Sequence, residues 1–258
     1  MYRFFFIALT AFGFQFSFAQ TKPVVKDKYG AVVRGDTLKK EIALVFTGDE
    51  FADGEKIIRS TLTKHKTKGS FFLTGNFYGN PSFKEIILNL KKEGHYVGAH
   101  SDKHLLYADW TRRDSLLVKQ SEFVQDIENN FSRMSEFGVT KSEAPFFIPP
   151  FEWYNAEIVE WSQLVNLSLI NFTPGLRSTA DYTYPEMGKS YLSSDKIYQS
   201  IANYESKSRN GLNGFILLIH IGTDPRRQDK FYSRLDSLMT FLEGKGYRFL
   251  RIDELISR

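Results

Sequence analysis

The sequence contains no cysteine among its 258 residues. Disulfide bonds are therefore excluded, and so is a lipid anchor on an N-terminal cysteine. An excess of one charge sign is also missing: 34 Lys and Arg against 30 Asp and Glu give a net charge of +4, with no long basic block. Charge therefore gives no indication of a nucleic-acid partner. Hydrophobic residues make up 42% and charged residues 25%, which indicates a globular chain and not a disordered one.

The N-terminus resembles an export signal. A short basic start is followed by the apolar stretch Phe4 to Phe18 and by a small residue, Ala19. We expect residues 1–19 to be a signal peptide that is cleaved before Gln20. The alternative is a single membrane anchor, but the apolar stretch is shorter than the ~20 residues that a spanning helix needs. The expected location is therefore secreted or periplasmic, with no membrane span after cleavage.

The body of the chain alternates between predicted strands and helices. Residues 20–39 are polar and are expected to form an N-terminal lead-in, and residues 40–258 a single domain. The predicted strands are Ile42 to Phe46, Ser70 to Leu73, Tyr96 to Ala99, Phe146 to Ile148, Ser168 to Ile170, Phe215 to Ile219 and Arg248 to Leu250. Helical patterns occupy residues 55–64, 81–93, 114–137, 195–208 and 231–242. This alternation predicts an α/β fold in which helices pack outside parallel strands, and about seven strands favour barrel-like closure.

Potential metal ligands and acid–base groups follow three of these strands. His100 and His104 come after the third strand, and in a helical turn two imidazoles four residues apart would face one ion. Asp49 follows the first strand and would complete a set of two histidines and one carboxylate. His220 ends the strand that begins at Phe215, where it would be placed as a general acid. Capping, turn or core roles are the alternatives for each of these residues.

The ordered set of motifs resembles the NodB-homology polysaccharide deacetylases, which are carbohydrate esterases. The motifs are the acidic loop after the first strand, Gly69 to Gly75, Glu93 to His104, Pro149-Pro150-Phe151 and Leu217 to His220. The resemblance implies a distorted (β/α)7 barrel of the NodB type and a divalent metal, most simply Zn²⁺, held by Asp49, His100 and His104. It also implies an acetylated oligo- or polysaccharide as the partner.

The chain departs from this family at two positions. The family carries two adjacent aspartates, a catalytic base and a metal ligand, where this chain has Phe46-Thr47-Gly48-Asp49-Glu50. Asp49 aligns with the ligand only through a one-residue slip. The family arginine that orients the base is replaced by Ile148. The resemblance therefore indicates a divergent member that lacks the paired-aspartate motif.

Several carboxylates are candidates to replace the missing base. They are Glu50, Asp102 and Glu152, with Asp49 in a double role as ligand and base. Glu152 directly follows the Pro149-Pro150-Phe151 motif, whose loop borders the active site in the family. Asp224, close after His220, could orient a histidine or cap a turn.

The sequence thus predicts metal-dependent hydrolysis of acetyl groups, amide or ester, by a non-standard site with His220 as acid and Glu152 or Asp49 as base. The alternative is a catalytically silent protein that binds carbohydrate or metal, and a third possibility is hydrolysis of another ester or amide. Activity on simple acetylated chitooligosaccharides is expected to be weak or undetectable, because the family's base is missing and a general base typically contributes ~10²–10⁴ in rate. Aromatic residues near the site motifs, among them Trp110 and Phe151, suit either sugar faces or loop packing.

Overall fold

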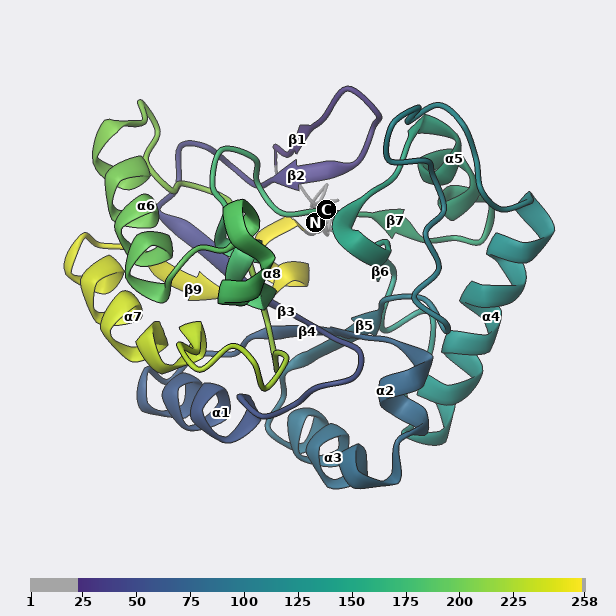
Figure 1. Ribbon diagram of the computed structural model, residues 1–258, viewed down its shortest axis with the longest axis horizontal. Coiled ribbons are helices and arrows are strands. Elements are labelled where there is room, and N and C mark those ends of the chain that lie inside the picture. The colour runs from purple at the N-terminus through teal and green to yellow at the C-terminus, as the bar shows by residue number, and fades with distance from the viewer. Residues whose placement is uncertain (1–22, 257–258) are drawn as a thin grey trace, which may run out of the picture.

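A computed structural model describes residues 23–256, and the expected signal peptide at residues 1–19 lies outside this range. A curled sheet forms the centre of the molecule, and helices surround it (Figure 1). Each predicted strand is present within a residue or two of its predicted bounds. Short runs of apolar residues bounded by turns are typical of strands that are buried on both faces, so this pattern was sufficient to locate the strands in the sequence.

The strands from β3 onward run parallel to one another. Within the described residues they are β3 (Glu41–Gly48), β4 (Ser70–Leu73), β5 (Tyr96–Ala99), β6 (Phe146–Phe147), β7 (Ser168–Leu169), β8 (Phe215–His220) and β9 (Arg248–Leu250). Their order in the sheet is β8-β3-β4-β5-β6-β7, and β9 pairs with the N-terminal half of β3. Because the strands are parallel, their carboxyl ends meet at one edge, where ligand sites of such folds lie.

The segment expected to be a lead-in contributes two strands. β1 (Val25–Lys26) and β2 (Val32–Arg34) form an antiparallel pair, and β2 lies beside β8. Val32 also pairs with Ile170, directly after β7, so the two sides of the sheet meet. This contact closes the curl into the distorted barrel that the sequence predicted. β2 was missed because residues 20–39 are mostly polar. Its Val32 and Val33 are buried, and β2 pairs with segments that are distant in sequence.

Helices cover the outside of the barrel (Figure 1). They are α1 (Glu55–Lys64), α2 (Gly75–Gly79), α3 (Lys84–Lys92), α4 (Gln120–Glu136), α5 (Ala156–Leu164), α6 (Ser194–Lys207), α7 (Leu235–Gly244) and α8 (Ile252–Ile256). The sequence pattern missed α2 and α5, and it began α4 six residues early, at Asp114. α2 is a single short turn that the Thr74 hydroxyl caps by accepting from the Phe77 amide at 3.1 Å. No helix within residues 23–256 has the length and apolar character to cross a membrane.

The core lies between the sheet and these helices. All eight residues of β3 are buried, and the Phe46 ring stacks on Phe71 with centroids 4.8 Å apart. Burial of a side chain of this size contributes roughly 1.5–3 kcal/mol. β3 is therefore rigidly held, and it presents Thr47, Gly48 and the following Asp49 at the carboxyl edge of the sheet.

Candidate active site

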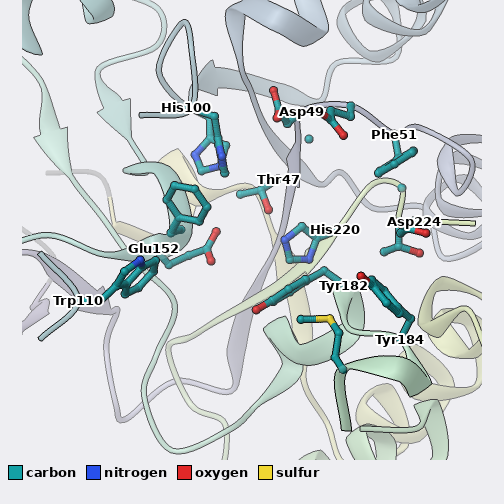
Figure 2. A pocket seen from close by; sticks show the side chains of 17 residues that line it. Thr47, Asp49, Phe51, His100, Trp110, Glu152, Tyr182, Tyr184, His220 and Asp224 are labelled. Atoms are coloured by element: carbon teal, nitrogen blue, oxygen red, sulfur yellow. The ribbon is translucent and has the colours of Figure 1, made fainter. Parts of the chain in front are cut away.

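A pocket opens at the carboxyl ends of β3, β5 and β8 and is bordered by the loop after β6. Its cavity measures about 520 Å³, within the ~300–1,000 Å³ typical of small-molecule sites. The predicted residues Asp49, His100, His104, Glu152 and His220 all line it (Figure 2). Residues from four separate parts of the chain thus converge on one cavity.

His100 and His104 meet by a different route from the one predicted. Residues 100–104 form no helix; they form a turn in which Ser101 (φ 74°) and His104 (φ 53°) are left-handed. The Ser101 hydroxyl accepts from the His104 amide at 2.8 Å and stabilises this turn. The two ring centroids lie 5.1 Å apart. The sequence could not show the turn, because left-handed conformation outside glycine is uncommon and depends on its surroundings.

Both of these imidazoles are suited to be neutral ligands. His100 Nδ1 lies 2.8 Å from the Ile148 carbonyl oxygen, so this nitrogen carries the proton and Nε2 has the free lone pair. Burial lowers the pKa of His100 well below its usual value, and the His104 ring lowers it further. Burial also lowers the pKa of His104, against the opposing effect of the Asp49 carboxylate. A hydrogen bond from Nδ1 to a carbonyl is typical of metal-bound histidine.

Asp49 is held by α2. Its Oδ1 accepts from the Thr74 hydroxyl at 2.7 Å and from the Asn76 side-chain Nδ2 at 3.1 Å. Within residues 23–256, no three His, Asp or Glu side chains are arranged closely enough to hold one metal ion. The two histidines therefore fit two nitrogen ligands, whereas Asp49 does not close the set with them in this conformation.

Thr47 and Gly48 occupy the stretch where the family resemblance would place two adjacent aspartates. Thr47 is 1% exposed, and its Oγ1 has no hydrogen-bond partner among the described residues. It lies opposite His220 in the β3–β8 register, and Figure 2 shows its hydroxyl directed toward the His220 ring. A Cβ at Gly48 would come within 2.6 Å of Ile221 Cγ2, so an aspartate has no room at this position unless its neighbours move.

Asp181 orients His220, and sequence reasoning missed it. His220 Nδ1 lies 2.7 Å from one Asp181 carboxylate oxygen, and the His220 amide donates to the other at 2.8 Å. Although burial alone would lower the pKa of His220, the Asp181 carboxylate and then Glu152 raise it above 6.5. Asp181 belongs to a 3-10 helix, Ser178–Tyr182, that is 39 residues distant in sequence and carries no motif.

Asp224 does not orient a histidine, which corrects one of the two roles considered for it. Its carboxylate accepts from the Arg226 amide at 2.8 Å and pairs with the Arg226 guanidinium at 2.5 Å. The second role, capping a turn, is therefore the right one. Proximity along the chain favoured Asp224, but the fold places Asp181 beside the ring instead.

Glu152 reaches the pocket through a strained loop. Phe151 (φ 59°) and Glu152 (φ 53°) are consecutive left-handed residues, each of which costs energy outside glycine. The Asn171 side chain holds this loop by donating to the Glu152 carbonyl at 2.9 Å. Burial raises the pKa of Glu152 to about 7, with Asp181 adding to the rise and His220 opposing it. In Figure 2 the carboxylate points into the same space as Thr47 and His220.

The other candidate bases differ in position. Asp102 is 2% exposed, accepts from Arg133 Nε at 2.9 Å and does not line the pocket, so it is no longer a candidate. Glu50 lines the pocket at its exposed rim. Ile148 is fully buried, and its carbonyl, not its side chain, serves the site through His100.

The sequence is similar to those of known proteins. A family model described as polysaccharide deacetylase matches residues 34–170, more than half of the chain. The chain is 24% identical over 232 residues to the peptidoglycan-N-acetylmuramic acid deacetylase of Bacillus subtilis, covering 89% of this chain and 76% of the relative. It is 24% identical over 233 residues to a peptidoglycan-N-acetylglucosamine deacetylase of Bacillus cereus, covering 89% and 73%.

Solved structures share the fold. A family 4 carbohydrate-esterase pseudoenzyme from Bacillus anthracis superposes with a TM-score of 0.67 at 16% identity, covering 89% of this chain and 70% of that one. A family 4 carbohydrate esterase from Bacillus subtilis gives a TM-score of 0.66 at 21% identity, covering 88% and 85%. The distorted barrel predicted from the sequence is thereby confirmed.

Proposed function

Because the chain belongs to the polysaccharide deacetylase family, we propose that it hydrolyses acetyl groups on carbohydrate through a non-standard pair of catalytic residues, Glu152 and His220. The observation that supports this most is that Glu152 and His220 line the same pocket and both have raised pKa values there. Burial gives the Glu152 carboxyl a pKa of about 7, and Asp181 with Glu152 raises that of His220. Groups with such values suit a base and an acid that operate near neutral pH.

In this mechanism the Glu152 carboxylate takes a proton from a water molecule, and the water oxygen attacks the acetyl carbonyl carbon. The carbon–nitrogen or carbon–oxygen bond to the sugar then breaks. Protonated His220 donates its proton to the departing amine or alcohol, so that acetate and the deacetylated sugar are the products. Asp181 accepts from His220 Nδ1 and holds the ring with Nε2 toward the substrate.

The unpartnered Thr47 hydroxyl supports the same assignment. It is buried beside His220 and is free to donate to the acetyl oxygen as negative charge develops there. Preorganised donors at this position stabilise the transition state because they need no reorientation during reaction. Thr47 would thus bind the acyl group at a position where the family supplies a carboxylate.

The metal is a separate part of the proposal. His100 and His104 would provide two nitrogen ligands and Asp49 a third after a change of its side-chain conformation. A divalent ion, most simply Zn²⁺, would supply Lewis acidity to the acetyl carbonyl. The protonation and orientation of the two imidazoles support this part of the proposal.

The decisive measurement is acetate release from a panel of acetylated glycans, with bound metal quantified on the same preparation. We expect measurable release that falls by a factor on the order of 10²–10⁴ in His220→Ala, without loss of bound metal. Complete absence of release from the wild-type protein, together with retained glycan binding, would support the second candidate. That candidate, a silent binding protein, is favoured by the absence of the aspartate pair at Thr47 and Gly48.

Export to the periplasm or beyond the cell is part of the same proposal, because acetylated structural glycans lie outside the cytoplasm. N-terminal sequencing of the protein exported by its native host should give Gln20 as the first residue. An intact Met1 on protein retained in the cytoplasm would contradict the proposed cleavage.

A further inference from the structure

One wall of the pocket is made of aromatic rings that remain open to solvent. Trp110 is 54% exposed and Phe151 is 42% exposed, and both line the cavity. Their ring centroids lie 5.6 Å apart, and Trp110 lies 5.2 Å from Trp153. Exposed apolar surface of this kind is unfavourable in water, and a contiguous patch of it is typical of a ligand-binding site.

This wall is held rigidly from behind. The Arg113 guanidinium lies 3.8 Å from the Trp153 ring centroid and donates from Nε to the Tyr154 carbonyl at 2.6 Å. The Trp153 indole donates to the Asp109 carbonyl at 3.2 Å. The wall therefore loses little conformational freedom when a ligand covers it, which favours binding.

The strained loop gives the wall its shape. The left-handed conformation of Phe151 places its ring centroid 4.4 Å from that of His104. The left-handed conformation of the next residue, Glu152, turns its carboxylate into the cavity. Two consecutive residues in this conformation persist only when their surroundings enforce them. The same strain thus sets a flat apolar surface beside the proposed base.

A second group of rings faces the cavity from the loop after β7. Tyr182 is 48% exposed and its ring centroid lies 5.5 Å from that of His220. Tyr184 is covered by the Arg226 guanidinium at 3.9 Å. Figure 2 shows Tyr182 below the His220 ring and Tyr184 on the side of His220 away from Trp110, so that aromatic surfaces lie on more than one side of the pocket. Sugar rings present flat C–H faces that suit such surfaces.

Acidic side chains dominate the charged lining of the pocket. Among the described residues that form it, four are carboxylates and none is a lysine or arginine; the four are Asp49, Glu50, Glu152 and Asp224. Arg226 reaches only the rim, where it is paired with Asp224, and His220 is paired with Asp181. The side chains that line the pocket would therefore offer an anionic ligand group no lysine or arginine as a partner, which makes its desolvation unfavourable.

We propose that the pocket binds an uncharged stretch of acetylated glycan, stacked on Trp110 and Phe151, and rejects sugars that carry a carboxylate, such as muramic acid. The choice of an acetylated glycan rests on the proposed function. The stacking surface and the charge selection rest on the wall and on the lining of the cavity.

The experiment measures binding, so that it is independent of turnover. Isothermal titration of the whole mature protein, in the presence of a chelator, compares chitotetraose with a tetrasaccharide of alternating N-acetylglucosamine and N-acetylmuramic acid. We expect the neutral oligosaccharide to bind at least ~10-fold more tightly, and Trp110→Ala to weaken its binding by about 10-fold. Trp161→Phe is the matched control, because Trp161 packs on Phe123 away from the pocket and should leave the affinity unchanged.

Three outcomes would overturn the proposal. They are equal or tighter binding of the muramic acid tetrasaccharide, binding that Trp110→Ala leaves intact in a variant with native circular dichroism, and no binding of either glycan. Phe151→Leu provides a second variant if Trp110→Ala does not fold. Tight, Trp110-dependent binding of chitotetraose without acetate release would refute the proposed catalysis while supporting the glycan site.

Discussion

Glu152 combines the clearest chemical role with the clearest structural cost. Its carboxyl group is partly buried in the pocket, its backbone is left-handed, and desolvation raises its pKa to about 7. A group in this position destabilises the folded protein when it is ionised. Such costs are typical of residues that are retained for function and not for stability.

Replacing Glu152 by glutamine should therefore lower activity and raise stability together. Acetate release should fall by a factor on the order of 10²–10⁴ with loss of the base. The folded carboxyl binds its proton more tightly than the unfolded one, so its contribution to stability is present below pH ~4.5 and is lost as pH rises through about 7. At pH 8 the variant should gain about 1–3 kcal/mol in the free energy of unfolding, measured with urea.

Controls separate the base from other carboxylates. Glu157→Gln, on α5 and exposed, should change neither activity nor stability. Activity that survives in both Glu152→Gln and Glu50→Gln would make Asp49 the favoured base. In the wild type, activity should rise with pH through about 7 as Glu152 loses its proton, and fall at higher pH as His220 loses its own. The two limits belong to the pair, because the groups interact.

Asp181 is a positioning residue that acts through His220. Asp181→Asn leaves only one oxygen to accept from both the His220 amide and Nδ1, and it removes the charge that raises the pKa of the ring. Activity should fall on the order of 10²-fold or more, and the alkaline limit of the pH profile should move to lower pH. A profile that keeps its alkaline limit would contradict this role; exposed Asp195→Asn is the control.

At the scale of elements, the loops after β3 and β5 carry the ligands of the proposed metal site. The turn at residues 100–104 brings two neutral imidazoles together, while α2 holds the Asp49 carboxylate through Thr74 and Asn76. The proposed metal site therefore depends on whether the Asp49 side chain leaves its contacts with Thr74 and Asn76 for the ion.

The double variant His100→Ala, His104→Ala should bind no stoichiometric metal. The physical reason is that both nitrogen ligands are removed, and one carboxylate alone holds Zn²⁺ weakly. Metal content measured by inductively coupled plasma mass spectrometry checks this, with His65→Ala as the control, because His65 does not line the pocket and is held between Asp236 and Glu243. A double variant that keeps one equivalent of metal would show that the ligands lie elsewhere.

At the scale of the whole molecule, closure of the barrel depends on contacts between distant segments. Thr173 is buried; its hydroxyl donates to the Val33 carbonyl at 2.6 Å and accepts from the Ile216 amide at 2.9 Å. It thus connects β2 and β8 with the segment that follows β7. The same segment continues to Asp181, which contacts His220. The residue that helps to close the barrel and the residue that orients His220 therefore lie on one connecting segment.

Thr173→Val keeps the shape of the side chain and removes both hydrogen bonds. The variant leaves a buried carbonyl and a buried amide without this partner, so the free energy of unfolding should fall by about 1–3 kcal/mol. Urea denaturation checks the value. Thr240→Val is the matched control and should cost less, because Thr240 is exposed and its hydroxyl donates to the Asp236 carbonyl within α7. A loss for Thr173→Val no larger than the control would show that this contact does not hold the barrel closed.

The sequence by itself determined the strands, because short apolar runs buried on both faces leave a signal in the residues themselves. It also placed Asp49, His100 and His220 at strand ends, where parallel topology brings them together, while Glu152 was identified through the Pro149-Pro150-Phe151 motif of the family. Only the tertiary structure decided that β2 closes the barrel, that Asp181 and not Asp224 orients His220, and that residues 100–104 form a turn. These features depend on partners 39 or more residues away or on left-handed backbone that the surroundings enforce, and neither leaves a periodic or local pattern in the chain.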